Sequence, residues 1–215
     1  MAVQVQTKNT LDGAQPSCTF DSDVVAGNLG VCFIRVSTGD GAVTNVTDDR
    51  GSTWTQVGGS QSISGGVSQL WYTEFASSGP CTVSLTGGDA RIQIEEVSGL
   101  VDPTLDSTNQ ATGTSAAPAS GIISPAVNAW LVAGISLSTY PSGALTAGAG
   151  WTPVEVSGNR YGFENQNSVS GGTYNGQFTL PESNTWAVIA AAFKAGGAPP
   201  PSTPAGRAAL LGVGG

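Results

Sequence analysis

Histidine is absent from this 215-residue chain, and its absence excludes several kinds of chemistry. Without histidine there is no Ser-His-Asp or Cys-His arrangement for nucleophilic catalysis, and no HExxH metalloprotease motif. Most zinc sites are excluded for the same reason. Paired carboxylates are the only hydrolytic machinery that the sequence can still supply.

Charge is also scarce. Charged residues make up 10% of the chain, against about a quarter in typical soluble domains, and the net charge is −8. An acidic chain lacks the basic surface that nucleic-acid binding requires, and anionic membrane surfaces repel it. No apolar run approaches the roughly 18 residues of a membrane-spanning helix. We therefore expect neither a nucleic-acid partner nor a membrane partner.

Cysteine is rare and its spacing carries no motif. Cys18, Cys32 and Cys81 include no C-x-x-C pair, which excludes a zinc ribbon or a thioredoxin-like site. Cys32 lies in the apolar run VCFIRV, and we interpret it as a small buried hydrophobe. A disulfide between Cys18 and Cys81 stays open as an alternative. The chain also begins without the features of a secretory signal. Either the mature protein starts here, or the protein is not exported; the second alternative fits synthesis and assembly in the cytoplasm.

What the sequence does contain is a period of two in hydrophobicity, typical of β-strands. The alternating segments are bounded by Gly, Pro, Asn or Ser, and glycine pairs suited to hairpins separate several of them. No stretch shows a sustained helical period. The expected strands cover residues 3–7, 31–37, 68–75, 81–87, 91–97, 129–137, 161–166, 176–180 and 185–193. The sequence predicts an all-β chain.

The two halves of the chain resemble each other. In each, an apolar strand leads to a Gly–Trp–Thr element (GSTWT at 51–55, GAGWT at 148–152), then to an aromatic strand, a glycine-containing hairpin and a final apolar strand. We expect an antiparallel β-sandwich, jelly-roll-like or immunoglobulin-like, over residues 1–196, with related halves at 17–99 and 121–195. We favour a single sandwich that interleaves both halves, with residues 99–120 crossing between them; two separate sandwiches are the alternative.

The order of these elements resembles a known module. AGNLG before a strand, VTDDRGSTWT, LWYTE, TVSLTG, IQIEEVSGL and DPTLD follow one another as in a β-sandwich module of bacterial surface proteins and of tail, fibre or head-decoration proteins of tailed bacteriophages. The resemblance covers roughly residues 17–194. Val97 stands where the module often carries an aromatic residue. The resemblance implies a β-sandwich used for display, adhesion or assembly, with no catalytic signature.

The stretch VTDDRGSTWTQV raises the question of a metal site. Asp48 and Asp49 are two adjacent carboxylates, whereas Ca²⁺ takes six to eight oxygen ligands. Asp-Asp-Arg-Gly also suits a turn, because Asp accepts local backbone N–H groups and Gly51 permits positive φ. The second half keeps the tryptophan, Trp151, without any preceding carboxylate. We therefore interpret Gly51, Trp54 and Trp151 as structural corners, and expect no metal and no cofactor.

Two other groups of side chains are candidate sites. Glu95 and Glu96 are the most suggestive carboxylate pair for catalysis, but adjacent strand residues face opposite sides of a sheet. We expect one of them to be exposed and the other to lie near a bulge or a partner surface. The stretch NRYGFENQN offers Tyr161, Asn165 and Asn167 for binding a glycan, and Trp71, Tyr72, Tyr140 and Tyr174 are further aromatic candidates.

The end of the chain departs from the strand pattern. Residues 197–215 begin with a proline-rich stretch, which favours an extended, semi-rigid spacer. Arg207, Leu210, Leu211 and Val213 follow as a short apolar segment. It is too short for a membrane span or for an independent helix. We interpret it as a docking peptide for a neighbouring subunit, with an incidental frayed terminus as the alternative.

Together these observations predict a non-enzymatic structural protein of a bacteriophage virion, made in the host cytoplasm, that decorates the particle or forms part of a head, neck or tail fibre. Other virion subunits and further copies of the chain are its expected partners. The alternative is a carbohydrate-binding adhesion module at the bacterial cell surface, with a host surface glycan as its ligand.

Overall fold

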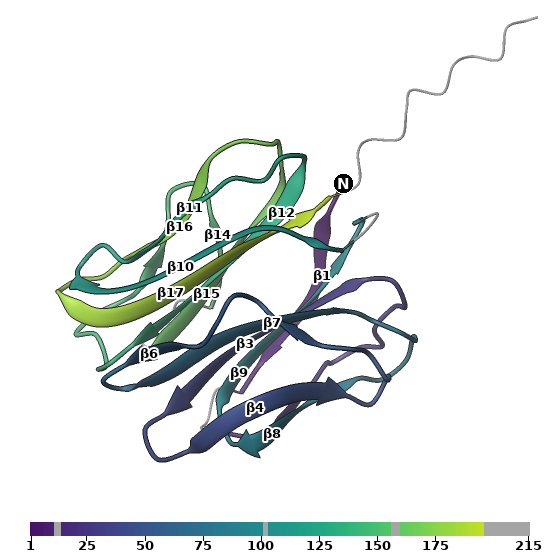
Figure 1. Cartoon of the computed structure of the whole chain (residues 1–215), viewed down its shortest axis with the longest axis horizontal. Coiled ribbons are helices and arrows are strands. Elements are labelled where there is room, and N and C mark those ends of the chain that lie inside the picture. The colour runs from purple at the N-terminus through teal and green to yellow at the C-terminus, as the bar shows by residue number, and fades with distance from the viewer. Residues whose placement is uncertain (11–13, 101–102, 156–159, 196–215) are drawn as a thin grey trace, which may run out of the picture.

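The structure is a computed structural model, and it describes residues 1–10, 14–100, 103–155 and 160–195. All regular structure in these residues is β-strand, and every pairing is antiparallel, which confirms the predicted fold class (Figure 1). The first half contains β1 (Val3–Asn9), β2 (Ser17–Thr19), β3 (Leu29–Ser37), β4 (Gly41–Asp48), β5 (Thr55–Gln56), β6 (Gln61–Ile63), β7 (Gly66–Glu74), β8 (Thr82–Gly88) and β9 (Arg91–Ser98). The second contains β10 (Leu105–Ser115), β11 (Ala119–Ile123), β12 (Ala129–Leu137), β13 (Thr146–Ala147), β14 (Thr152–Glu155), β15 (Tyr161–Val169), β16 (Tyr174–Thr179) and β17 (Asn184–Lys194).

Each half builds one large and one small sheet, and the strand order is the same in both. The large sheets run β1-β9-β3-β7-β5, with β6 also beside β7, and β10-β17-β12-β15-β14. The small sheets run β2-β8-β4 and β11-β16-β13. Each strand named in these two orders of the first half has one counterpart at the same position in the strand order of the second half. The repeat seen in the sequence is therefore a repeat of topology, and the prediction of two related halves is confirmed.

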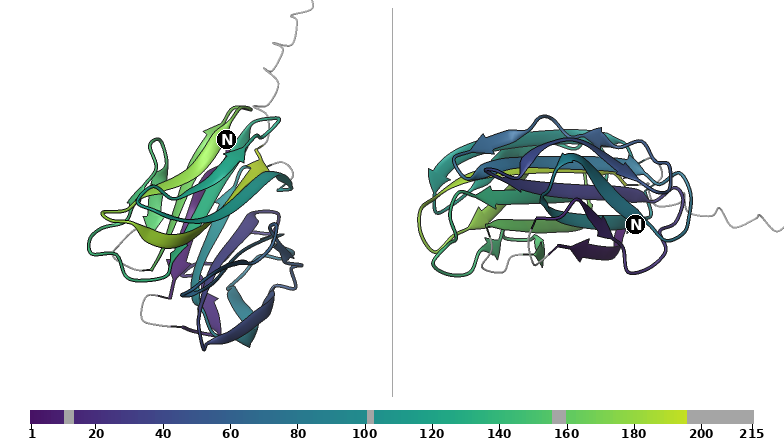
Figure 2. Two further views of the ribbon diagram at one scale, coloured as in Figure 1. Left: turned by 60° about the vertical axis from the view of Figure 1, so that its left-hand side comes forward. Right: turned by 90° about the horizontal axis from the view of Figure 1, so that it is seen from below.

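The sheets stack in four layers (Figure 2). The two large sheets face each other in the middle, and each small sheet covers the outer face of its own large sheet. Strand β3 shows the alternation: Cys32 and Ile34 pack toward the small sheet of the first half, whereas Val31 and Phe33 pack toward the second half. Because both faces of the large sheets are covered, β3, β12 and β17 are buried along almost their whole length.

The central core between the large sheets is the contact that joins the halves. Its rings include Phe33 and Phe163, with centroids 5.8 Å apart, and Tyr72 and Phe193, at 5.1 Å. Val97, the residue that departs from the module, is fully buried in this core. Burying apolar area contributes about 25 cal/mol per Å², so this layer is a major source of stability.

The halves do not interleave, contrary to the arrangement that we favour from the sequence. No strand within the described part of the chain pairs with a strand of the other half, and each half closes its own sandwich. Residues 105–115, expected inside a crossing segment, form the edge strand β10 and pair with β17. This strand is rich in Ser, Thr, Asn and Gln, so it carries no apolar stripe by which a sequence pattern could reveal it.

Hydrogen bonds between the two halves add to the apolar contact. Asn9 donates its side-chain amide to Glu155 Oε2 at 3.0 Å. Arg35 Nη2 donates to the carbonyl oxygen of Leu137 at 3.3 Å. Arg35 is buried, and burial followed by the nearby charges of Arg160 and Arg91 lowers its pKa to about 10. The halves are therefore held in register by polar contacts as well as by the core.

All three cysteines lie in the core of the first sandwich as free thiols. Burial is the main cause that raises the pKa of Cys18 to about 11 and that of Cys81 to about 12. Burial also raises the pKa of Cys32. The interpretation of Cys32 as a small buried hydrophobe is confirmed, and the structure contains no Cys18–Cys81 bridge.

Candidate functional site

The Asp-Asp-Arg-Gly stretch forms a turn at the end of β4, whose last residue is Asp48. Asp48 Oδ1 accepts hydrogen bonds from the backbone N–H groups of Arg50 at 2.8 Å and Ser52 at 3.1 Å. Its Oδ2 accepts from the indole nitrogen of Trp54 at 2.8 Å. Asp49 Oδ1 accepts from the side chain of Arg50 and from the backbone of Thr82, both at 3.1 Å. With these donors aimed at both Asp48 oxygens, the turn is built around the carboxylate.

The electrostatics of Asp48 agree with a structural role. Burial alone would raise its pKa, but the hydrogen bonds from Ser52, Trp54 and Arg50 outweigh burial and lower it. Gly51 has φ of 80°, a backbone conformation that favours glycine. Within the described ranges, no three His, Cys, Asp or Glu side chains lie together as a metal site would require.

The two corner tryptophans occupy equivalent positions. Trp54 directly precedes β5 and Trp151 directly precedes β14, and these strands are counterparts in the two large sheets. Their exposed fractions are 7% and 8%, and each packs inside the core of its own sandwich. Trp54 also contacts Phe75 edge to face, with centroids 6.4 Å apart. The structure therefore places both tryptophans where the structural interpretation requires them.

The second corner uses a carboxylate from a neighbouring strand, which sequence reasoning missed. Glu164 of β15 accepts the backbone N–H of Gly148 at 2.8 Å and that of Gln177 at 3.2 Å. Burial raises its pKa to about 8 despite these two hydrogen bonds. No spacing in the sequence pairs Glu164 with Gly148, because their contact depends on how the strands fold together.

Glu95 and Glu96 are both fully buried, so the expectation that one of them is exposed is wrong. Glu96 accepts hydrogen bonds from the side chains of Gln6 at 2.6 Å and Asn28 at 2.7 Å, and from the backbone of Val25 at 2.8 Å. These partners come from the edge strand β1 and the segment before β3, and they use both carboxylate oxygens. Glu96 therefore ties these segments to β9.

Glu95 faces the second half, on the opposite side of β9. Its Oε1 accepts from the Asn165 side chain at 3.2 Å, and its Oε2 has no hydrogen-bond partner within the described residues. Burial raises the pKa of Glu95 to about 8, although the hydrogen bond from Asn165 opposes this. Burial therefore favours the protonated form of this side chain. Neither carboxylate reaches solvent, where a polysaccharide would have to bind.

The glycan candidates do not form an exposed platform. Tyr161 and Asn165 are buried between the halves, and of the three proposed residues only Asn167 is exposed. Asn165 also donates to Gln4 Oε1 at 2.9 Å, so its side-chain amide links the second half to the first. Among the other aromatic candidates, Trp71 is buried, Tyr72 and Tyr174 are half-buried, and Tyr140 is 57% exposed with the guanidinium of Arg160 5.0 Å from its ring centroid.

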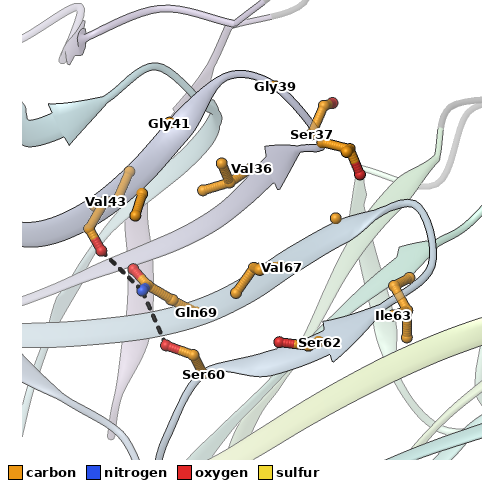
Figure 3. Close-up of a pocket in the computed structure, with 13 residues that line it drawn as sticks. Val36, Ser37, Gly39, Gly41, Val43, Ser60, Ser62, Ile63, Val67 and Gln69 are labelled. Carbon is orange, nitrogen blue, oxygen red and sulfur yellow. Dashed lines mark hydrogen bonds between the residues drawn. The ribbon is translucent and has the colours of Figure 1, made fainter.

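A groove of about 710 Å³ opens at one end of the first sandwich, between β4 and the β6–β7 hairpin (Figure 3). Sequence reasoning missed this groove. Its apolar lining is Val36, Val43, Ile63 and Val67, and hydroxyl groups of Ser37, Thr38, Ser60 and Ser62 line it as well. Glycine and alanine complete the lining with Gln69. The groove therefore has no charged and no aromatic wall.

Gln69 is already saturated with hydrogen bonds. Its side-chain nitrogen donates to the Val43 carbonyl at 3.1 Å and to Ser60 Oγ at 3.0 Å, and its oxygen accepts from the Trp71 indole at 3.0 Å. This amide thus bridges the two walls of the groove (Figure 3). A ligand in the groove would meet mainly methyl groups, hydroxyl groups and backbone.

The docking residues Arg207, Leu210, Leu211 and Val213 lie outside the described residues, as does Asn159 of the glycan stretch. No helix in the described part of the chain is long and apolar enough to cross a membrane. No protein-family model, no curated protein and no solved structure matches this chain. The resemblance to the phage and surface-protein module therefore rests on the sequence motifs alone.

Proposed function

We propose that this chain is a non-enzymatic structural subunit of a tailed-bacteriophage virion, made in the host cytoplasm. It decorates the particle or contributes to a head, neck or tail fibre, and its partners are other virion subunits and further copies of itself. The observation that carries the proposal is that the fold itself uses the side chains that suggest chemistry. Asp48 organises a turn, and Glu95 and Glu96 are buried in contacts between strands.

The architecture supports a load-carrying or surface-covering role. The two sandwiches share one apolar core, because their large sheets face each other and are covered on both faces. An acidic chain of low charge also resists nonspecific adhesion to nucleic acid during assembly.

Immunogold electron microscopy tests the proposal. An antibody raised against the purified protein should label phage particles from the source culture at a regular position, and preimmune serum should not. Particles that carry no label when intact, and no trace of the chain by mass spectrometry after disassembly, would overturn it.

A glycan array tests the carbohydrate-binding alternative. Tyr161 and Asn165 cannot contact a glycan, because their side chains are buried. The purified protein should bind no glycan on the array. Specific binding that Asn167→Ala or Tyr140→Ala abolishes would favour the adhesion module.

A further inference from the structure

The groove between β4 and the β6–β7 hairpin lies between two sheet edges. Among the strands of the described residues, β4 ends the order of the small sheet and pairs with β8 alone, whereas β6 pairs with β7 alone and also lies against β10 and β17 of the second half. An edge strand presents unpaired backbone N–H and C=O groups, to which another extended chain can add. The walls of the groove are therefore suited to a peptide in an extended conformation.

The lining of the groove selects an uncharged, apolar occupant. Val36, Val43 and Val67 offer methyl groups, while no lining side chain can pair with a charged ligand or stack on a sugar ring. The C-terminal segment has this composition: after Arg207 the chain reads AALLGVGG, with no further charged side chain and two leucines and a valine. Leu211 and Val213 are two residues apart, so in an extended strand they face the same side.

We propose that this groove receives the C-terminal segment around Leu211 and Val213 of a second copy of the chain, added as an extended strand. The contact is head to tail. The tail of one copy enters the groove of the next, so the contact builds an open chain or a closed ring of copies. Repetition around an assembly strengthens even a weak single contact through avidity.

The positions of the groove and of the chain exit favour a second copy over the same copy. The β6–β7 hairpin lies at the start of β17: a Cβ on Gly65 would be 2.5 Å from the carbonyl oxygen of Ser138, whose backbone nitrogen donates to Thr185 at 2.9 Å. The described chain leaves at the other end of β17, after Lys194. A strand of this length spans about 34 Å at roughly 3.4 Å per residue.

The spacer leaves little slack for a return to the same groove. Residues 196–209, if extended as a proline-rich sequence favours, span roughly 43 Å at about 3.1 Å per residue. A path back to the chain's own groove must cover the length of β17 and then pass around two sheet layers, which lie about 10 Å apart. A neighbouring copy aligned end to end presents its groove directly to the spacer.

The test is self-association of the full-length protein, measured by sedimentation velocity over a range of concentrations. Ser62→Trp fills the groove from an exposed position, and Leu211→Asp with Val213→Asp places charges on the docking face. Each variant should weaken self-association by about tenfold or more, as the loss of a central apolar contact does. Asn45→Trp, exposed on β4 outside the groove, and Ser202→Asp, in the spacer, are matched controls that should associate normally.

Mixing the two defective proteins separates the possible outcomes. The Ser62→Trp protein keeps a good tail and the Leu211→Asp/Val213→Asp protein keeps a good groove, so an equimolar mixture should form heterodimers that do not grow further. A full-length protein that stays monomeric at every concentration, or variants that associate like the controls, would overturn the proposal. Because the purified protein is sufficient, this result does not depend on whether the chain belongs to a virion.

Discussion

Phe33 of β3 and Gly134 of β12 meet across the central core, where the ring of the first half lies against the bare backbone of the second. A Cβ built on Gly134 would lie 2.3 Å from Cδ2 of Phe33, closer than real Cβ contacts allow. The spacing of the two large sheets at this point therefore depends on the absence of a side chain at position 134.

Gly134→Ala should destabilise the protein by about 1–3 kcal/mol, because an added methyl group in a closely packed core forces its neighbours to shift. Urea unfolding followed by tryptophan fluorescence measures the change. Gly143→Ala is the matched control, since its nearest neighbour is a Pro181 side-chain atom at 3.4 Å. Equal stability of the two variants would show that the central sheets are not in close contact at Phe33.

Substitution of either corner tryptophan should destabilise the protein more than Gly134→Ala does. Trp54→Ala and Trp151→Ala are each expected to cost about 3–5 kcal/mol, as large-to-small core substitutions do. Thermal unfolding followed by circular dichroism is the measurement. A loss below about 1 kcal/mol for either would contradict its placement in the core.

Asp48→Ala should cost about 1–3 kcal/mol, because it leaves the buried indole N–H of Trp54 without its partner. Asp49→Ala is the matched neighbour and should cost less, since its side chain is 48% exposed. Calcium should leave the melting temperature of the wild-type protein unchanged. A calcium-dependent rise that Asp48→Ala removes would instead restore the metal-site interpretation.

Stability should fall as pH rises from about 4.5 to about 8. Glu95 and Glu164 have pKa values raised from 4.5 to about 8 in the folded protein, so the folded state keeps protons that the unfolded chain releases. Their contribution is complete below pH 4.5 and is lost as pH rises through about 8. The free energy of unfolding, measured in urea across this range, should therefore be larger at the acidic end.

Glu95→Gln should make this pH dependence shallower, because glutamine resembles the protonated side chain and does not titrate. Glu74→Gln, at an exposed position of β7, is the matched control for replacing a carboxylate by an amide. If Glu95→Gln and Glu74→Gln give the same slope, Glu95 is not protonated in the folded state.

The three thiols should be unreactive in the folded protein. Burial raises the pKa of Cys18, Cys32 and Cys81, so little thiolate forms and reagent has no access. A thiol-specific dye at mildly alkaline pH should react only slowly with the native protein. After denaturation without reductant, the dye should label all three cysteines. A count of one thiol after denaturation would mean that two cysteines form a disulfide.

The strands that have an apolar pattern could be predicted from the sequence, and those without one could not. The apolar runs in 31–37 and 185–193 identify β3 and β17, and the repeated tryptophans reveal the duplication. The edge strand β10 has no apolar stripe, so its residues read as a connection. The separation of the halves was also not predictable, because a strand buried on both faces looks the same in either arrangement.

The candidate sites show the same division. A local turn such as the one around Asp48 depends on neighbouring residues and could be predicted from them. The burial of Glu95 and Tyr161 depends on which sheet covers the other, and that information lies in contacts between residues far apart in the chain. The groove beside Val43 is formed by residues 36–43 and 60–69, which are near in sequence, but its shape depends on how β4 lies against the β6–β7 hairpin, and no local pattern specifies that.

The covered faces of the two large sheets determine how the protein responds to dilution. A chain of one half alone would expose Val31, Phe33 and Leu70 and would have to bury them against a second molecule, so its stability would depend on concentration. In this protein both halves belong to one chain, so the contact between the two faces is intramolecular. The Leu211→Asp/Val213→Asp protein, which cannot associate through its tail, should therefore melt at the same temperature in micromolar and nanomolar solution, because its two halves stay folded without help from a second molecule.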